Sequence, residues 1–457
     1  MSKTRSVAIF TVLIFAISIS ATAQQHLTGT LGDGATYVID VPAQWNGTLL
    51  LYSHGYVVPG SPNPAQDVGD PITGAFLLNA GYALAGTSYA TTGWAVHEAI
   101  PDQTAVLDVF NTQVGPPIKT IAWGHSLGGM ITAGLIQEHP ERFTAALPMC
   151  GVLSGGVGTW NQGLDGAFVF NTLIAGGALQ VVHITNPGQN LGLAEAFLSA
   201  AQATPQGRAR LALVAALGDT PGWFDPTSPE PPKNDYTDRE VNQFLWFQNV
   251  DWPFEFALRA ELEFRAGGNP SWNTGVDYEE QLEHSVNRQE VKVLYKKAGL
   301  DLKADLQTLN QTLRIAADPA AVEYLKQNII YNGQISMPVL TLHTSGDGLV
   351  VVENEQAYKS VVREAHNNPL LREVFVHRAG HCEFSPAETL VAFGALSLRV
   401  ATGQWPELEP DDLNFVAGLL GPTFNVIFVN HTVVPAAPSF FEFEPPRFLR
   451  PFDAFTK

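Results

Sequence analysis

Short apolar runs alternate with segments of helical spacing over the first third of the chain and again near its end. Runs rich in β-branched and aromatic residues predict strands, and apolar positions three and four residues apart predict helices. The first part has expected strands at 35–42, 47–53, 81–89, 118–123 and 143–149, and helices at 98–113, where Pro101 suits the first turn, and at 127–139. Such alternation predicts an α/β fold, with a mostly parallel, doubly wound sheet.

The alternation stops between residues 151 and 336 and then resumes. The middle segment has helix-like pieces at 165–180, 191–203, 206–217, 238–265 and 299–327, and a proline-rich connector at 218–236 divides them. Strands are expected again at 337–343 and 371–378, helices at 352–366 and 386–400, and one strand-like run at 424–430. A connection this long is not an ordinary loop. We therefore expect a sheet domain from 24–150 and 337–401, a mainly helical insertion at 151–336, and a C-terminal extension at 402–457 packed on the sheet domain.

The first 23 residues have the pattern of a secretory signal peptide. Lys3 and Arg5 precede an apolar stretch at 7–19, which is short for a bilayer span, and the small residues at 21–23 suit cleavage after Ala23. No cysteine follows that site, which argues against a lipid anchor. We expect a secreted or periplasmic protein with no transmembrane segment after cleavage; an uncleaved anchor is the alternative.

Composition narrows the classes of partner. The formal net charge of −19 repels nucleic-acid phosphates, and no basic stripe or zinc-finger spacing offsets it. The 45% hydrophobic content of the 457 residues is typical of a globular protein with a large core. Two cysteines do not make a disulfide scaffold. The expected partner is a small-molecule or polymer substrate, and nothing in the sequence indicates an oligomeric state.

A serine between glycines stands where a strand is expected to end and a helix to begin. The stretch is Gly124-His125-Ser126-Leu127-Gly128, with a further glycine at 129. This spacing makes a sharp turn that lifts the serine hydroxyl above the edge of a sheet. The alternative is a helix N-cap serine after a glycine turn. The position between an expected strand and helix favours Ser126 as a nucleophile.

This segment resembles the nucleophile turn of α/β-hydrolases, and in particular of secreted lipases and esterases. The resemblance covers about 35–150 and 337–400 and implies a nucleophile, an acid and a histidine in that order along the chain. Asp347, in a loop after the expected strand 337–343, matches the acid. Its alternative role is that of a turn residue between two glycines. We expect Glu353 and Glu355 to face solvent on the next helix.

The histidine base should follow the last strand of the sheet domain. His381 comes after Ala379-Gly380 in an expected loop, whereas His377 lies within the strand pattern and is the alternative. The other histidines show no metal-ligand spacing, so neither a metal nor a cofactor is expected. The resemblance therefore implies a Ser126, His381 and Asp347 triad.

An acyl-transfer site of this kind also needs two backbone N–H donors for the oxyanion. One should be that of Leu127, directly after the nucleophile. The other should come from the His54-Gly55-Tyr56 segment after the strand at 47–53, with the N–H of Tyr56 as donor, Gly55 allowing close approach and His54 structural.

Cys382 directly follows the expected base, as a cysteine does in the tannase and feruloyl esterase family. In that family the partner cysteine precedes the serine, but here His125 holds that position. Cys150 instead ends the next expected strand at the same edge of the sheet. A Cys150–Cys382 bridge is expected to pin the histidine loop, with two buried thiols as the alternative. Because the cysteine positions differ, the resemblance does not imply that this protein acts on the substrates of that family.

The insertion lies where α/β-hydrolases place a cap, and it is rich in aromatic residues. Most of them should form its own core, and a minority should face substrate. Tyr89 and Trp94, with Gly93, are candidates for the pocket entrance, with plain packing as the alternative.

The leading hypothesis is a secreted serine hydrolase that cleaves carboxylic esters through an acyl-enzyme. The alternative is an amide-cleaving, aminopeptidase-like hydrolase with the same triad. A non-catalytic binding protein and a cofactor-free lyase on this fold are further alternatives. The sequence does not discriminate ester from amide.

Overall fold

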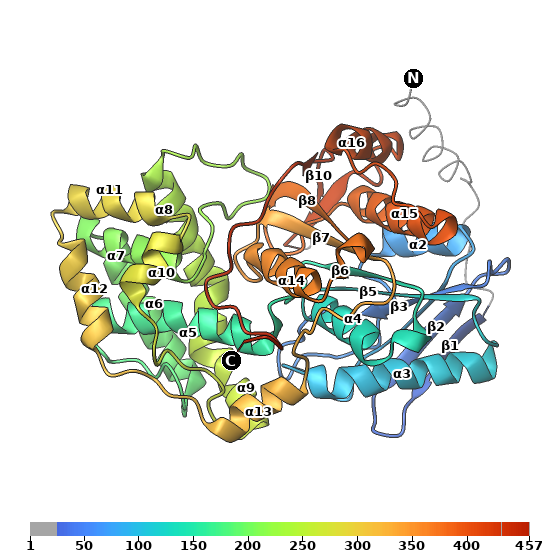
Figure 1. Cartoon of the computed structure of the whole chain (residues 1–457), viewed down its shortest axis with the longest axis horizontal. Helices are drawn as coiled ribbons and strands as arrows, with labels where there is room; N and C mark the ends of the chain where they lie inside the picture. The colour runs from blue at the N-terminus through green and yellow to red at the C-terminus, as the bar shows by residue number, and fades with distance from the viewer. Residues whose placement is uncertain (1–24, 431, 457) are drawn as a thin grey trace.

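The chain folds into a sheet-containing part and a helical part (Figure 1). The computed structural model describes residues 25–430 and 432–456. The expected signal peptide at 1–23 lies outside the described residues. Within them, no helix combines the length and the apolarity needed to cross a membrane.

The sheet of the described chain has nine strands in the order β1-β2-β4-β3-β5-β6-β7-β8-β11. Their bounds are β1 Gln25–Thr30, β2 Thr36–Val41, β3 Thr48–Ser53, β4 Ala83–Thr87, β5 Lys119–His125, β6 Ala145–Met149, β7 Val339–Gly346, β8 Leu371–Ala379 and β11 Phe440–Phe441. The strands from β4 to β8 run parallel, while β1, β2 and β11 pair antiparallel at the two edges. Every residue of β3, β4 and β6 is buried, as expected for parallel strands covered on both faces.

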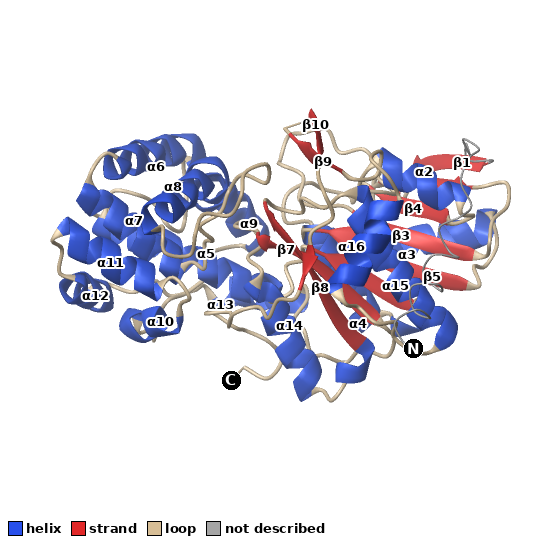
Figure 2. Cartoon of the chain, turned by 90° about the horizontal axis from the view of Figure 1, so that it is seen from above, coloured by secondary structure: helices blue, strands red, loops and turns tan. Residues whose placement is uncertain are grey.

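Helices cover both faces of this sheet (Figure 2). One face packs against α3 (Val96–Gln113), α4 (Leu127–Glu138) and α14 (Glu353–Glu364), and the other against α2 (Pro71–Asn79), α15 (Pro386–Thr402) and α16 (Pro410–Leu419). The doubly wound α/β fold is therefore confirmed. Helix α3 begins at Val96, so Pro101 lies in its second turn and not in its first, because the buried Val96, Ala99 and Ile100 extend the apolar stripe toward the N-terminus.

The segment between β6 and β7 is helical and has a hydrophobic core of its own. Its helices are α5 Gly155–Leu173, α6 Pro187–Gln202, α7 Pro205–Leu217, α8 Tyr236–Trp246, α9 Arg259–Ala266, α10 Tyr278–His284, α11 Arg288–Ala298, α12 Leu302–Gln311 and α13 Pro319–Gln327. The sequence pattern did not reveal α10 and α11, which are short, and it merged α12 with α13. A side-chain cap marks the start of α10, where the Asp277 carboxylate accepts the N–H groups of Glu279 and Glu280; α11 has no such cap.

The expected long helix at 238–265 is interrupted by two π-helical turns. These are η2 (Phe247–Asp251) and η3 (Phe254–Leu258), and Pro253 lies between them. Proline cannot donate a backbone hydrogen bond, so a regular α-helix is disfavoured at this point. Single π turns often occur at functional sites, where they alter which side chains share a helix face.

The C-terminal tail contacts both parts of the molecule, and Figure 1 shows it passing between them (dark red). The strand-like run at 424–430 forms β9 (Val426–Val429), which pairs with β10 (Thr432–Pro435) in a separate hairpin outside the main sheet. Further on, Phe448 packs against Val351 and Ala357 of the sheet-containing part. Arg450 forms an ion pair with Asp165 on α5, so the tail also holds the helical segment.

We expect Gly128→Ala to destabilise the protein, because a Cβ at this position would overlap the backbone of Ser53. Overpacking of this kind costs about 1–3 kcal/mol or more. The matched control is Gly192→Ala in α6, where nothing lies within 4 Å of an added Cβ and the helix gains about 1 kcal/mol. Thermal unfolding measures both, and equal melting temperatures for the two variants would contradict the role given to Gly128.

Candidate active site

Ser126 lies at a strained turn between β5 and α4. Its backbone has φ 59° and ψ −124°, a region that non-glycine residues seldom occupy, and its N–H donates to the Met149 carbonyl at 3.0 Å. Side chains at Gly124 or Gly128 would meet the backbone of Ser53. The two glycines thus let the turn pack closely against the end of β3, and the turn holds the hydroxyl above the sheet.

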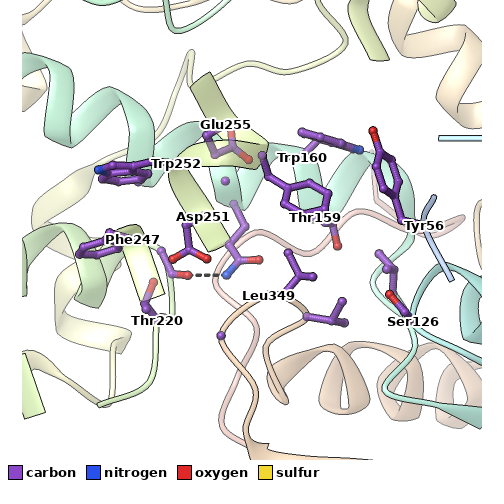
Figure 3. A pocket seen from close by; sticks show the side chains of 18 of the residues that line it. Tyr56, Ser126, Thr159, Trp160, Thr220, Phe247, Asp251, Trp252, Glu255 and Leu349 are labelled. Carbon is purple, nitrogen blue, oxygen red and sulfur yellow. Dashed lines mark hydrogen bonds between the residues drawn. The ribbon is translucent and has the colours of Figure 1, made fainter. Parts of the chain in front are cut away.

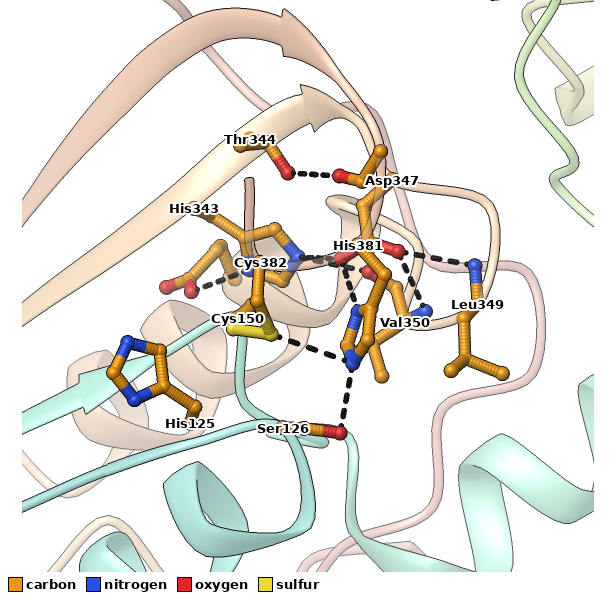
Figure 4. The surroundings of a disulfide bond; sticks show 12 residues. His125, Ser126, Cys150, His343, Thr344, Asp347, Leu349, Val350, His381 and Cys382 are labelled. Carbon is orange, nitrogen blue, oxygen red and sulfur yellow. Dashed lines mark hydrogen bonds and ion pairs between the residues drawn. A yellow bond between two sulfur atoms is a disulfide. The ribbon is translucent and has the colours of Figure 1, made fainter. Parts of the chain in front are cut away.

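The structure brings Ser126, His381 and Asp347 together, although they are far apart in sequence (Figure 4). The Ser126 hydroxyl lies 2.8 Å from His381 Nε2, and His381 Nδ1 lies 2.7 Å from Asp347 Oδ2. Asp347 follows β7 and His381 follows β8, so the carboxyl ends of parallel strands position all three. This geometry allows the histidine to accept the serine proton while the carboxylate orients the ring.

Asp347 is a buried carboxylate with a full set of partners. Its Oδ1 accepts the N–H groups of Leu349 and Val350, each at 3.0 Å. Burial by itself would raise the pKa of Asp347, but the facing His381 and His343 more than offset it, so this pKa is lowered. The carboxylate therefore stays ionised where an unpaired one would not.

Two expectations about the neighbouring residues are decided by the structure. His377, the alternative base, is partly exposed and lies 2.9 Å from Glu230, away from Ser126. Glu353 and Glu355 were expected to face solvent, and this is wrong: both are buried, because α14 packs this face on the sheet. Glu355 bonds to Thr341 and His343 of β7.

The expected oxyanion donors flank the serine. Leu127 opens α4, and Tyr56 follows Gly55, whose added Cβ would lie 3.3 Å from the Ser126 Cβ. Outside the regular helices and sheets of the described chain, no hydrogen bond uses the N–H of Leu127 or of Tyr56 as donor. His54 is buried between backbone and the stacked ring of Tyr89. Burial lowers the pKa of His54, which fits a structural residue.

A disulfide joins Cys150, after β6, to Cys382, next to His381. The expected bridge is therefore present, with a Cα–Cα distance of 5.4 Å, and it closes a separation of 232 residues. Cys382 Sγ lies 3.3 Å from His381 Nε2, as Figure 4 shows. The position before the serine, a cysteine in the tannase family, holds His125 here, which is half-buried and bonds to the Tyr52 hydroxyl at 3.1 Å.

Ser126 opens on a largely apolar pocket between the sheet and the helical segment (Figure 3). Its aromatic lining consists of Tyr56, Trp94, Trp160, Phe247, Trp252 and Phe254. Trp94, a candidate from the sequence, thus lines the pocket. Tyr89 does not: it is buried against His54, and its hydroxyl donates to the His54 carbonyl at 3.0 Å.

Two carboxyl groups line this pocket on the side away from Ser126, as Figure 3 shows. Asp251 is in η2 and Glu255 is in η3. Burial and the neighbouring Glu255 raise the pKa of Asp251 well above its usual range, and burial raises that of Glu255 to about 7 in spite of Arg259. Arg259 lies 3.1 Å from Glu255, and no ion pair of the described chain involves Asp251.

Sequence reasoning missed most of these pocket residues. Phe247, Asp251, Phe254 and Glu255 all lie in the π turns around Pro253. A proline inside a helical pattern was the available signal, because it marks a place where regular packing is broken. No cluster of metal-ligating side chains occurs among the described residues.

The fold and the nucleophile turn define an α/β-hydrolase. The chain belongs to the family of the o-phthalyl amidase of Xanthobacter agilis, with 32% identity over 431 residues that cover 85% of this chain and 90% of that protein. It is therefore a hydrolase. No family model matches the sequence.

Among solved structures, two esterases show a partial likeness. Feruloyl esterase B of Aspergillus oryzae has 12% identity and a TM-score of 0.38, over 87% of this chain and 91% of that one. A further esterase of Aspergillus oryzae has 14% identity and a TM-score of 0.42, over 90% of this chain and 83% of that one.

Removing the disulfide should both destabilise the protein and loosen the histidine. We expect the Cys150→Ala/Cys382→Ala variant to lose about 2–5 kcal/mol of unfolding free energy. We also expect it to react more slowly with a fluorophosphonate, which labels activated serines. Calorimetry measures the stability, and the rate of fluorophosphonate labelling, with and without reductant, measures the reactivity of the serine. A variant with both the stability and the labelling rate of the wild type would contradict the role of the bridge.

Proposed function

We propose that this protein is a serine hydrolase that cleaves amides of aromatic carboxylic acids through an acyl-enzyme, with esters of the same acids as further substrates. The observation that carries this proposal is the Ser126–His381–Asp347 contact chain at the mouth of an aromatic pocket. The amidase relative supports the amide, since its name gives an aromatic acyl group and an amide bond. Ester hydrolysis, the leading expectation from the sequence, stays a prediction.

In the proposed reaction, Ser126 Oγ attacks the carbonyl carbon while His381 Nε2 takes the hydroxyl proton. The N–H groups of Leu127 and Tyr56 hold the negative oxygen of the tetrahedral intermediate. His381 then donates the proton to the leaving nitrogen, and the C–N bond breaks. Water, deprotonated by His381, releases the acid from Ser126. An ester needs less help with departure because an alkoxide or phenoxide is a better leaving group than an amide anion.

The pocket wall supports an aromatic acyl group. The rings of Trp94 and Trp160 meet edge to face, with their centroids 5.5 Å apart. The ring centroids of Tyr56 and Phe254 lie 5.2 Å apart. Aromatic rings prefer such offset and edge contacts, and each pair adds about 0.5–1.5 kcal/mol beyond area burial. We propose that the helical segment acts as the cap of the site, because it supplies Trp160 and Phe254.

We also propose that the protein is exported. The disulfide beside the base supports this, since such bonds persist in oxidising compartments. The sequence pattern of residues 1–23 points the same way.

Ser126→Ala should abolish hydrolysis of both bond types. We expect a loss on the order of 10⁶-fold, as in a protease triad, measured with benzoyl and hexanoyl derivatives as matched p-nitroanilides and p-nitrophenyl esters. Benzoyl compounds should react faster than hexanoyl ones. The control is Ser228→Ala, which removes an exposed hydroxyl bonded only to Asp225. Unchanged anilide and ester rates in Ser126→Ala would overturn the proposal.

The Asp251 carboxyl should make the acyl preference pH-dependent. Its raised pKa means that it is neutral at low pH and becomes a carboxylate as the pH rises. The kcat/KM ratio of o-carboxybenzoyl to benzoyl anilide should therefore fall with rising pH, because a carboxylate in the pocket repels an anionic acyl group.

Asp251→Asn should weaken this dependence and leave only the part due to Glu255, which lines the same pocket, while Asp225→Asn, outside the pocket, should keep it in full. A ratio that falls equally in both variants would show that Asp251 does not face the acyl group.

A further inference from the structure

A buried ion pair lies directly behind the carboxylate of the triad. His343 of β7 and Glu355 of α14 are 0% and 1% exposed, and His343 Nδ1 lies 2.9 Å from Glu355 Oε1. His343 Nε2 lies 2.8 Å from the Val350 carbonyl and 3.6 Å from Asp347 Oδ2. A chain of side chains thus runs from Glu355 through His343, Asp347 and His381 to Ser126.

Every polar atom of this pair has a partner. The Thr341 hydroxyl donates to the second Glu355 oxygen at 2.6 Å. Both His343 nitrogens face acceptors, Glu355 on one side and Val350 on the other, so both sites suit a proton. Burial by itself would lower the pKa of His343, but Asp347 and Glu355 raise it to about 10. The imidazolium form therefore fits this place.

We propose that His343, held by Glu355, is a positioning residue that fixes the Asp347 loop and supplies a fixed positive charge behind the triad carboxylate. The role rests on the proposed function. His343 does not contact substrate; it acts through Asp347. Nε2–H anchors the Val350 carbonyl, and the Val350 N–H in turn binds Asp347 Oδ1. The His343 ring thus fixes Val350, and Val350 in turn fixes the Asp347 carboxylate.

The positive charge has a definite task in the resting enzyme. When His381 is neutral, Asp347 would otherwise be a buried carboxylate without a cation, which favours its protonation. A protonated Asp347 no longer selects the His381 tautomer with its proton on Nδ1 and its lone pair toward Ser126. With His343 charged, Asp347 stays ionised without requiring a charge on His381.

The other titratable groups around the pair do not replace this charge. Besides Asp347, Glu355 and His381, the surroundings contain Glu353 and Tyr358 on α14, Glu373 on β8 and Tyr331 before β7. None of these four is a cation. Glu373 has its own partner in Lys359 at 3.0 Å.

The kinetic test compares His343→Gln, Glu355→Gln and the double variant on p-nitrophenyl benzoate. We expect kcat to fall at least tenfold with KM within about twofold. The acid limb of the kcat/KM profile, which reports protonation of His381, should move up by about one pH unit, because the variants lack the positive charge that disfavours a charged His381. The double variant should be no worse than His343→Gln, because both changes break one unit. The control is Glu373→Gln, which breaks a different, partly exposed pair with Lys359 and should leave the acid limb in place.

A merely structural role has a different signature. Lower melting temperatures in the His343 and Glu355 variants, with the acid limb unmoved and kcat within threefold of wild type, would overturn the proposal.

A second measurement does not need activity. In ¹⁵N-labelled Ser126→Ala protein, the ring nitrogens of His343 should both remain protonated at pH 8, and Glu355→Gln should convert the ring to its neutral form. A neutral His343 at pH 8 with Glu355 present would refute the proposal. A wild type no faster than Ser126→Ala on every ester and anilide would instead refute the proposed function, and the NMR result would still decide the charge.

Discussion

The site depends on keeping one carboxylate ionised in a dry environment. Asp347 is 1% exposed, and an isolated charge at such depth would take up a proton instead. Two amides of its own loop, His381 in front and His343 behind surround it. These groups come from β7, the loop after β8, and the loop between β7 and α14. The proposed chemistry at Ser126 therefore requires the sheet and α14 to be packed together first.

The helical segment supplies one wall of the pocket next to this charge arrangement. It contributes Trp160, Phe247, Trp252 and Phe254, while Trp94 and Tyr56 come from loops after β4 and β3. The π turns around Pro253 bring Asp251 and Glu255 to the same pocket. The C-terminal tail joins Phe448 to the sheet-containing part and Arg450 to α5, so it links that part to the helical segment.

The fold class and the three residues of the contact chain could be predicted because each leaves a local pattern. Buried parallel strands read as apolar runs, and the turn at Ser126 needs glycines at fixed places. The edge strands β1 and β11 escaped prediction because β1 is largely exposed and β11 has only two residues. Glu355 was expected to face solvent because a charged residue on a helix usually does. Its hydrogen bonds to His343 and Thr341 offset the cost of burying its carboxylate.

By itself, the sequence determined a doubly wound α/β sheet interrupted by a helical insertion, and a glycine-flanked serine turn followed along the chain by Asp347 and His381. These follow from periodicity and from steric demands within a few residues. Only the tertiary structure decided that the two cysteines bond, that Trp94 rather than Tyr89 lines the pocket, and that His343 and Glu355 lie buried together behind Asp347. Those features depend on contacts between segments up to hundreds of residues apart, and burial reverses the ordinary preference of charged side chains for water.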